Sequence, residues 1–289
     1  MRIALATYSK RPQLTEWDQK LIPLFQNESI HAEAVVWDAP HEEWSNFDAI
    51  IIRSIWDYHL KYKEFINWLS HLKTLEIPVL NPIEILKKNA HKFYLKELCN
   101  KGISVLPSLY LEQSHHIDLS QIKKLGWENA VIKPAVSASS FLTKSFNQND
   151  IPNIEKEYKE VINERDLLVQ QFAPEIPETG EYSIMFFNRT YAHTVLKKAK
   201  QGEFRVQSDF GGSARSVFMD KHIIDQAEEI LSHFEGPILQ ARVDGIIRND
   251  QFVLMEIELI EPQLFFNLDK NALSLYVQSA TSILRKLKA

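Results

Sequence analysis

The chain has 289 residues, of which 45% are hydrophobic and 25% are charged, and its formal net charge is −5. This is the balance of an ordinary globular protein, and the length suits two or three compact modules. The small negative charge, without a long run of like charges, disfavours a nucleic-acid partner, although a local basic cleft can still hold a phosphate group.

The composition also bears on the compartment. A single cysteine, Cys99, excludes an internal disulfide framework, so nothing in the sequence calls for an oxidising environment. The first residues turn polar too soon for a signal peptide, and no apolar run approaches the roughly 20 residues of a membrane-spanning helix. We therefore expect a cytoplasmic protein without membrane contact.

The first part of the chain alternates short apolar runs with helical patterns. Strands are predicted at residues 3–7, 34–37, 49–53 and 78–82, and helices at 15–25 and 62–75. Alternation of this kind is typical of a parallel sheet with crossover helices. Residues 1–86 are therefore predicted to form an N-terminal α/β domain.

The pattern changes after residue 86. A helix at 93–101 is followed by strands at 105–111, 130–134 and 167–171, and then by extended segments at 182–187, 191–196, 237–243 and 252–260. These later segments read as antiparallel strands, so the rest of the chain is predicted to be α+β. We divide it into a central lobe, 87–168, and a C-terminal lobe, 169–289.

Three carboxylates stand out near the end of the chain. Glu256 and Glu258 are two residues apart on a predicted strand and so point to the same face. A hairpin through residues 246–251 would bring Asp244 beside them. Three hard oxygen donors without histidine or cysteine suit Mg²⁺. The alternative is a solvated face of an antiparallel sheet, which the apolar neighbours of the two glutamates disfavour.

A lysine at the end of a buried-looking strand indicates a phosphate contact. Lys133 is followed by the small residues of segment 135–140, which includes Ser139 and whose backbone N–H groups could approach a phosphate closely. A mere edge charge is the alternative. The sequence lacks both the Gly-Lys-Ser/Thr pattern of a P-loop and the GxGxxG fingerprint of a dinucleotide-binding fold.

Seven short motifs occur in a characteristic order. They are Lys92 at a helix start, then segments 131–134, 169–172, 180–183, 202–205, 242–244 and 256–258. This order resembles the ATP-grasp superfamily of carboxylate–amine ligases, particularly enzymes like glutathione synthetase. The ending at 258–262 is also similar to that of the cyclo-ligase of cycloserine biosynthesis.

The resemblance implies an N-terminal domain followed by a two-lobed ATP-grasp fold, and an ADP-forming ligase that makes a C–N bond through an acyl phosphate. It implies ATP and Mg²⁺, or Mn²⁺, as cofactors. The residues implied for ATP are Lys92, Lys133, Ser139, Gln170, Phe172, Glu181 and Lys197. Arg205 and Arg242 match the catalytic basic positions, and Asp244, Glu256 and Glu258 match the metal ligands.

The chain departs from the family pattern at two places. Many members have asparagine where Glu258 stands, and the loop at 135–140 contains no glycine. The first departure adds a negative charge to the expected metal site. The second leaves the phosphate contacts of the loop open.

The N-terminal domain contributes Arg53 and Asp57 at the end of a predicted strand, where ligands bind in open α/β sheets. Arg53 could hold a carboxylate and Asp57 an ammonium group, which suits a small amino-acid-like substrate with an amine as second partner. A structural Arg–Asp pair is the alternative. A homodimer stays open, as do two rival functions: a phosphotransferase, and a nucleotide-binding regulator without turnover.

Overall fold

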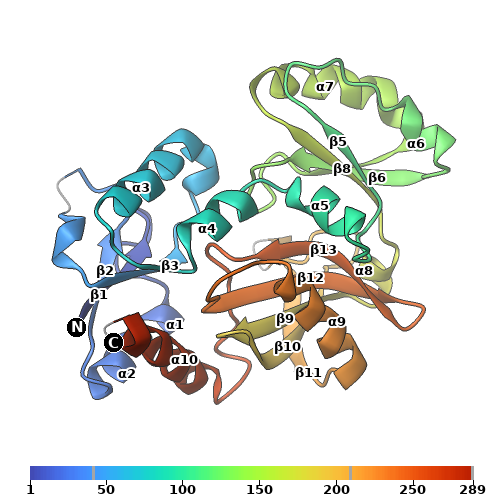
Figure 1. Cartoon of the computed structure of the whole chain (residues 1–289). Helices are drawn as coiled ribbons and strands as arrows, with labels where there is room; N and C mark the ends of the chain where they lie inside the picture. Colours follow the sequence, from blue (N-terminus) through green and yellow to red (C-terminus); the bar gives the residue numbers. More distant parts are fainter. Residues whose placement is uncertain (41–42, 208–209, 288–289) are drawn as a thin grey trace.

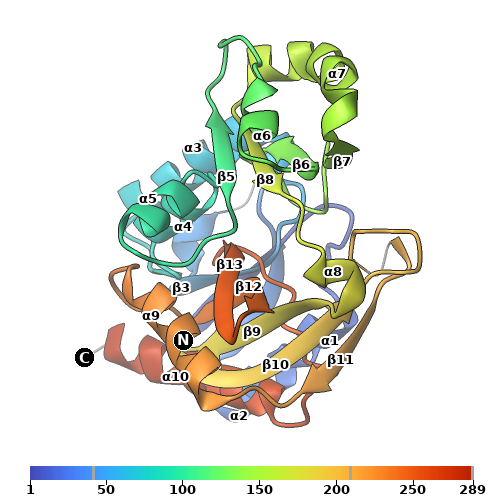
Figure 2. The same ribbon diagram turned by 90° about the vertical axis from the view of Figure 1, so that its right-hand side faces the viewer.

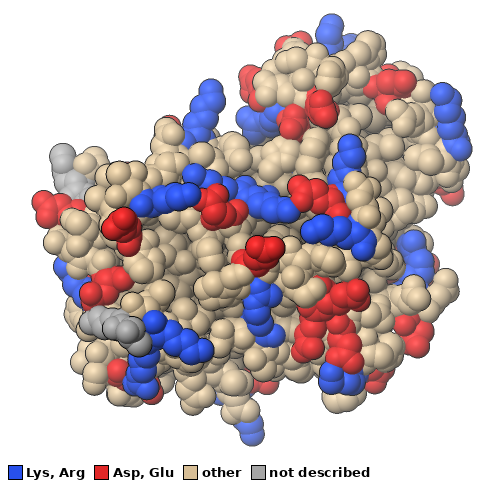
Figure 3. Space-filling view, viewed as in Figure 1, with Lys and Arg blue, Asp and Glu red and all other residues tan. Residues whose placement is uncertain are grey.

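The computed structural model describes residues 1–40, 43–207 and 210–287, and across these residues the strands form three sheets. Figure 1 shows the sheets as separate bodies that meet near the middle of the molecule. Among the helices of these ranges, none combines the length and the hydrophobicity that a membrane-spanning helix requires. On the face shown in Figure 3, positive and negative side chains are interspersed, in keeping with the small net charge.

The first sheet is parallel, as predicted. It consists of β1 (Arg2–Thr7), β2 (His31–Val36), β3 (Ala49–Ser54) and β4 (Val79–Leu80), in the order β2-β1-β3-β4. Every residue of β3 is buried, as expected for a central strand covered on both faces. The helical elements of this module are α1 (Glu16–Gln19), α2 (Leu21–Asn27), η1 (Trp44–Asn46), η2 (Tyr58–Leu60), α3 (Tyr62–Thr74) and α4 (Ile83–Asn89).

The second sheet is antiparallel and has the order β5-β8-β6-β7. Its strands are β5 (Ser108–Leu111), β6 (Asn129–Pro134), β7 (Lys144–Asn147) and β8 (Leu167–Gln171). The helices here are α5 (Tyr94–Asn100), α6 (Ser120–Lys124), η3 (Gln148–Asp150) and α7 (Ile151–Glu164). Because β8 pairs within this sheet, the predicted boundary between residues 168 and 169 falls inside a strand of the second module.

The third sheet is also antiparallel, which confirms the α+β prediction for this part of the chain. It has the order β11-β10-β9-β12-β13, and Figure 2 shows it below α7 and the second sheet. Its strands are β9 (Glu181–Phe187), β10 (Thr190–Lys198), β11 (Ser213–Val217), β12 (Gln240–Arg248) and β13 (Gln251–Glu258), accompanied by α8 (Glu175–Glu178) and α9 (Lys221–Ser232).

The last helix, α10 (Ala272–Leu287), returns to the beginning of the chain. Its buried Tyr276 and Leu284 belong to the same apolar core as Ile3 and Phe25 of the N-terminal module and Phe187 of β9. The C-terminal helix therefore joins the first sheet to the third.

Two buried asparagines fix the end of β13 relative to the N-terminal module. Asn81 donates to the carbonyls of Gln240 and Leu259 at 2.8 and 2.7 Å. Asn89 donates to the carbonyl of Ile257 at 2.8 Å and accepts from the amide of Leu259 at 2.9 Å. These bonds satisfy backbone groups at the end of a strand and hold the segment that follows Glu258 in place.

Candidate active site

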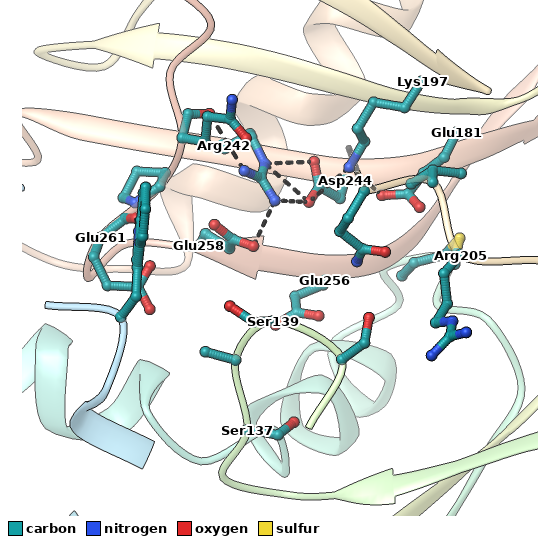
Figure 4. Close-up of a pocket in the computed structure, with 18 of the residues that line it drawn as sticks. Ser137, Ser139, Glu181, Lys197, Arg205, Arg242, Asp244, Glu256, Glu258 and Glu261 are labelled. Carbon is teal, nitrogen blue, oxygen red and sulfur yellow. Dashed lines mark hydrogen bonds and ion pairs between the residues drawn. The ribbon is translucent and has the colours of Figure 1, made fainter. Parts of the chain in front are cut away.

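A cavity of about 530 Å³ is lined by residues from all three modules. In the part of the chain that the structure describes, every predicted site residue except Asp57 lines this cavity. Figure 4 shows this cavity, with the acidic and basic side chains of β12 and β13 on one wall and the serine-containing loop opposite.

The β12–β13 hairpin brings the three predicted carboxylates together. Asp244 lies opposite Glu256 in the antiparallel register, and Arg242 lies opposite Glu258. The alternation of side chains along both strands explains why these residues share a face. The juxtaposition expected from the hairpin is confirmed.

Arg242 organises the buried end of this acidic face. Its guanidinium donates to both carboxylate oxygens of Asp244 at 2.8–3.0 Å and to Glu258 Oε1 at 2.5 Å. Asp244 also accepts from Ser183 Oγ at 2.5 Å. Burial raises the pKa of Asp244, but Arg242 and Lys197 outweigh it and lower that pKa to about 2, so this carboxylate is ionised at neutral pH.

The remaining carboxylates carry more negative charge than Arg242 can balance. Burial, together with Asp244 and Glu256, raises the pKa of Glu258 to about 7 despite the neighbouring arginine. Burial and Glu258 raise the pKa of a further cavity residue, Glu261, well above its usual value. Such crowding favours the binding of a cation or of protons.

Two lysines from the second module approach the acidic face from the other side. Lys92 Nζ donates to the carbonyl of Ser137 at 2.7 Å and lies 3.0 Å from Glu256 Oε1, and Lys133 Nζ lies 3.7 Å from Glu256 Oε2. Burial lowers the pKa of Lys133, although Glu256 opposes that effect. The side chains of Lys92 and Lys133 are only 5% and 13% exposed, and at such buried positions the attraction of a lysine for an anion is stronger than in bulk water.

The far end of the cavity combines polar groups with apolar walls. Lys197 lies 2.6 Å from Glu181 Oε1 and 3.5 Å from Asp244 Oδ2. Gln170 is buried, and its amide donates to the carbonyl of Met255 at 3.4 Å. Leu106, Val131, Met255 and Phe172 also line this cavity. Apolar walls with a few polar groups are typical of pockets that bind small molecules.

Arg205 lies apart from the Arg242 cluster, as Figure 4 shows. Its guanidinium pairs with Glu203 at 2.6 Å and stacks over the ring of Phe210 at 3.6 Å from the ring centre. In this arrangement it lines the cavity from the segment after β10 but does not reach the carboxylates of β12 and β13.

Arg53 and Asp57 do not form a joint site. Arg53 is 2% exposed and pairs with Asp18 at 2.9 Å, while Nη1 donates to Gln240 Oε1 at 2.5 Å. Asp57 instead accepts from Trp37 Nε1 at 2.9 Å and pairs with Lys61 at 3.1 Å. The alternative, a structural pair between Arg53 and Asp57, does not form either, because Arg53 pairs with Asp18, which is distant in sequence.

Several cavity residues have no counterpart in the sequence prediction. Glu261 had a local signal, since it belongs to the Glu-Leu-Ile-Glu-Pro segment at 258–262. Arg11, Asp18 and Trp56 also line the cavity, and no spacing in the sequence indicated it. They reach it because the segments that follow β1 and β3, which include α1, begin at the same edge of the parallel sheet.

The donor set partly fits the predicted divalent cation. Within the described ranges, no three His, Cys, Asp or Glu side chains are arranged so that they could bind a metal ion without rearrangement. Asp244 is engaged by Arg242 and Ser183, whereas Glu256 and Glu258 keep about a quarter of their side chains exposed to the cavity. Two hard carboxylates in an excess of negative charge fit Mg²⁺ when other oxygen ligands complete the shell.

Comparison with solved structures defines the class of fold. The chain is similar to an ATP-grasp RimK domain protein from Sphaerobacter thermophilus, with a TM-score of 0.68 and 17% identity, over 96% of this chain and 99% of that one. It is also similar to D-alanine–D-alanine ligase from Bacillus anthracis complexed with ATP, with a TM-score of 0.69 and 14% identity, over 99% of both chains. The chain therefore has the ATP-grasp fold, and the predicted fold class is confirmed.

A more specific similarity is to a protein of cycloserine biosynthesis. Residues 3–81 match the family described as the N-terminal domain of D-cycloserine synthetase DcsG. The chain is 22% identical to the cycloserine biosynthesis protein DcsG of Streptomyces lavendulae over 273 residues. This alignment covers 89% of this chain and 90% of that protein. The crystal structure of D-cycloserine synthetase DcsG has a TM-score of 0.87 and 20% identity, over 98% of this chain and all of that one. The predicted relationship to the ATP-grasp ligases and to the cycloserine enzyme is confirmed.

Proposed function

We propose that this chain is an ATP- and Mg²⁺-dependent, ADP-forming ligase that joins a small amino-acid-like carboxylate to an amine. The observation that carries the proposal is the set of cations, Lys92, Lys133, Lys197 and Arg242, which faces a row of carboxylates in one cavity between the modules. The relatives named as synthetase and ligase support the same class of reaction.

The nucleotide fits the end of the cavity that holds Gln170 and Phe172. We assign the adenine to the apolar walls there, with Gln170 and Phe172 beside it, and the ribose hydroxyls to Glu181. The phosphates then extend toward Lys92 and Lys133, and toward Ser139 in the loop after β6. Neutralising a triphosphate requires several positive charges, and these lysines are held in place before the ligand arrives.

Glu256 and Glu258 would hold Mg²⁺, which supplies charge neutralisation between the phosphates and the acidic face when bound. The roles of Arg242 and Lys197 follow from their position. A carboxylate oxygen of the substrate bonds to the γ-phosphorus as the bond to ADP breaks. Arg242 and Lys197 stabilise the negative charge that collects around the transferred group, and Arg205 is assigned to the same charge from the segment after β10.

The second step forms the new bond. The amine nitrogen bonds to the carbonyl carbon of the acyl phosphate, the C–O bond to phosphate breaks, and the proton lost from nitrogen leaves with the phosphate. Arg242 is the cation closest to the acidic row and is assigned to the oxyanion of this step. The cavity walls limit the access of water, which would otherwise hydrolyse the acyl phosphate.

The proposal is tested by ADP release with a panel of amino acids and small amines, followed by mass spectrometry of the products. Hydroxylamine in place of the amine should trap the activated acyl group as a hydroxamate in an ATP-dependent reaction. A phosphorylated product without any amide or hydroxamate would indicate a phosphotransferase instead. ATP binding with no ADP release for any pair would indicate a regulator. Chelation of divalent cations should abolish turnover, and Mn²⁺ is expected to restore part of it.

ATP as a substrate is consistent with the cytoplasmic location expected from the sequence. That location, like the substrate class, stays a proposal.

A further inference from the structure

The loop between β6 and β7, residues 135–143, forms part of the cavity wall. Ser137, Ser139 and Ser140 of this loop line the cavity, and Figure 4 shows the first two of them there. Phe141 is the next residue in the chain but does not line the cavity. The proposed nucleotide site gives it no role, so its contacts elsewhere in the molecule are of interest.

The backbone of this loop is unusual for a segment without glycine. Ser139, Ser140 and Leu142 have φ angles of +51°, +57° and +46°. This left-handed region is open to glycine at no steric cost, but other residues remain there only when their surroundings hold them in place. The conformation of the β6–β7 loop therefore depends on contacts with the rest of the protein.

The N-terminal module supplies some of these contacts. Val136 and Ala138 of the loop pack against the apolar core of that module, which includes Phe65. The ring of Phe141 lies against the ring of His59 in η2, with 5.1 Å between the ring centres. The loop that borders the proposed phosphate position is thus docked on a different module from the one whose strands it connects.

His59 is suited to this contact because it is an uncharged aromatic group. It is 7% exposed, and burial, followed by the nearby charge of Lys92, lowers its pKa to about 4. The imidazole is therefore neutral at neutral pH and can pack against a phenyl ring without burying a charge.

The second module holds the same part of the loop from its own side. The guanidinium carbon of Arg165 lies 5.5 Å from the centre of the Phe141 ring, within the range of a cation–π contact. Next to Phe141, the carbonyl of Leu142 accepts from the hydroxyl of Tyr158 in α7 at 2.8 Å. Phe141 therefore contacts one residue of each module.

We propose that Phe141 is a positioning residue for the ATP phosphates, which acts by docking the β6–β7 loop on His59 and Arg165. The docked loop presents Ser139 and Ser140 to the cavity before the nucleotide arrives, so little ordering is needed on binding. This inference rests on the proposed function and deepens it, because it makes phosphate binding depend on the N-terminal module. Docking also explains how a loop without glycine keeps its left-handed backbone.

The test compares ATP with adenosine, which has no phosphate. Mg²⁺–ATP is titrated calorimetrically, and adenosine is titrated by ligand-observed NMR, which suits weak binding. The variants are Phe141→Ala, which removes the ring, and Phe141→Tyr, which keeps it. Phe218→Ala is the control, because Phe218 is 89% exposed and does not line the cavity.

Phe141→Ala should weaken ATP binding about tenfold, as expected when a loop has to be ordered on binding, and should leave adenosine binding unchanged. Phe141→Tyr and the control should keep the wild-type affinity for both ligands. Melting temperatures are measured on the same preparations. A lower melting temperature with unchanged ATP affinity would show that Phe141 has a structural role only.

A second variant, His59→Ala, tests the contact between the modules. It should weaken ATP binding as well, whereas His71→Ala, at an exposed position of α3 in the same module, should not. Because Phe141 acts through His59, the double variant should lose less affinity for ATP than the sum of the two single losses.

The inference is overturned if Phe141→Ala binds ATP as the wild type does, if ATP and adenosine are weakened equally, or if the losses of the double variant are additive. ADP release by the wild type would then leave the ligase proposal standing. The expected changes in ATP affinity, without ADP release from any pair of substrates, would support the inference and contradict the ligase proposal. A wild-type protein that binds no ATP would contradict both.

Discussion

At the scale of single residues, the site depends on charges that the protein holds in a confined space. Lys92 and Lys133 both approach Glu256, and Arg242 is bound between Asp244 and Glu258. With all groups ionised, the first set has one positive charge in excess, which a triphosphate would balance. The second set has one negative charge in excess, which a cation would balance. The two imbalances are complementary and match an anionic ligand that arrives with a metal ion.

Lys133→Met should weaken ATP binding about tenfold or more, since a lost charge-assisted contact is worth roughly 1.5–3 kcal/mol. Calorimetric titration of ATP with Mg²⁺ measures the effect. Lys144→Met is the control, because Lys144 lies on the neighbouring strand β7, is exposed and pairs with Glu157. Equal ATP affinity in the two variants would remove Lys133 from the nucleotide site.

Glu258→Gln should stabilise the ligand-free protein at alkaline pH. Because the pKa of Glu258 is raised from 4.5 to about 7 in the folded state, the folded protein binds more protons than the unfolded chain between these values. Stability therefore falls as pH rises through that window, and the loss persists above it. The glutamine variant lacks this loss.

The measurement is the melting temperature with a chelator present, near pH 8 and near pH 4.5. A change of 1 kcal/mol in the free energy of unfolding shifts the melting temperature by about 2–4 °C in proteins of this size. We therefore expect the glutamine variant to melt a few degrees higher than the wild type near pH 8 and at nearly the same temperature near pH 4.5. A gain of equal size at both values would show that the titration of Glu258 is not its cause.

At the scale of elements, the β12–β13 hairpin positions most of the acidic face. Its register is regular through the pairs Arg242–Glu258 and Asp244–Glu256 and shifts between Asp244 and Gly245. Gly245 permits the close approach of the strands at this point: an added Cβ would lie 2.4 Å from the carbonyl oxygen of Val253 and 2.6 Å from the ring of Phe252. A side chain at position 245 would therefore clash with the backbone of the neighbouring strand β13.

Gly245→Ala is expected to destabilise the protein by about 1–3 kcal/mol or more, as overpacking does, and to lower turnover by displacing Asp244 from Glu256. Thermal unfolding and ADP release on the same preparation measure the two effects. Wild-type stability with wild-type turnover would contradict the account of this strand contact.

At the scale of the whole molecule, one buried polar network joins parts of the chain that are far apart in sequence. Gln240 at the start of β12 accepts from Arg53 of β3 and from the hydroxyl of Tyr276 in α10 at 2.7 Å. Its own amide donates to the carbonyls of Ile52 and Ile260 at 2.9 and 3.0 Å. The first sheet, the third sheet and the last helix meet at this side chain.

Arg53→Met should therefore lower stability by about 3–5 kcal/mol, because it leaves Asp18 buried without its partner. The protein that stays folded should bind ATP normally, since the partners of Arg53 include none of the residues assigned to ATP. Asp18→Asn together with Arg53→Met should recover part of the loss, because the uncompensated charge is gone. Reduced ATP affinity at unchanged melting temperature would contradict this structural role and return Arg53 to the ligand site.

Features that depend on local spacing could be predicted from the order of the amino acids. The parallel N-terminal sheet follows from short apolar strands that alternate with helices, and β3 is buried throughout as its composition requires. The shared face of Asp244, Glu256 and Glu258 follows from the period of two along a strand and from a short hairpin. The strand–helix alternation and the shared face of the carboxylates both depend on residues that are close in the chain, so the pattern of side chains predicts them.

Contacts between residues far apart in the chain could not be predicted in this way, because they depend on how the three modules pack. Arg53 pairs with Asp18 and Gln240 rather than with nearby Asp57, because the fold brings α1 and the start of β12 to the end of β3, while Asp57 bonds to Trp37. Glu261 is buried and α10 covers the first sheet because the modules close upon one another. Partners of this kind are chosen by the packing of whole surfaces, and many pairings of the same residues satisfy the local pattern equally well.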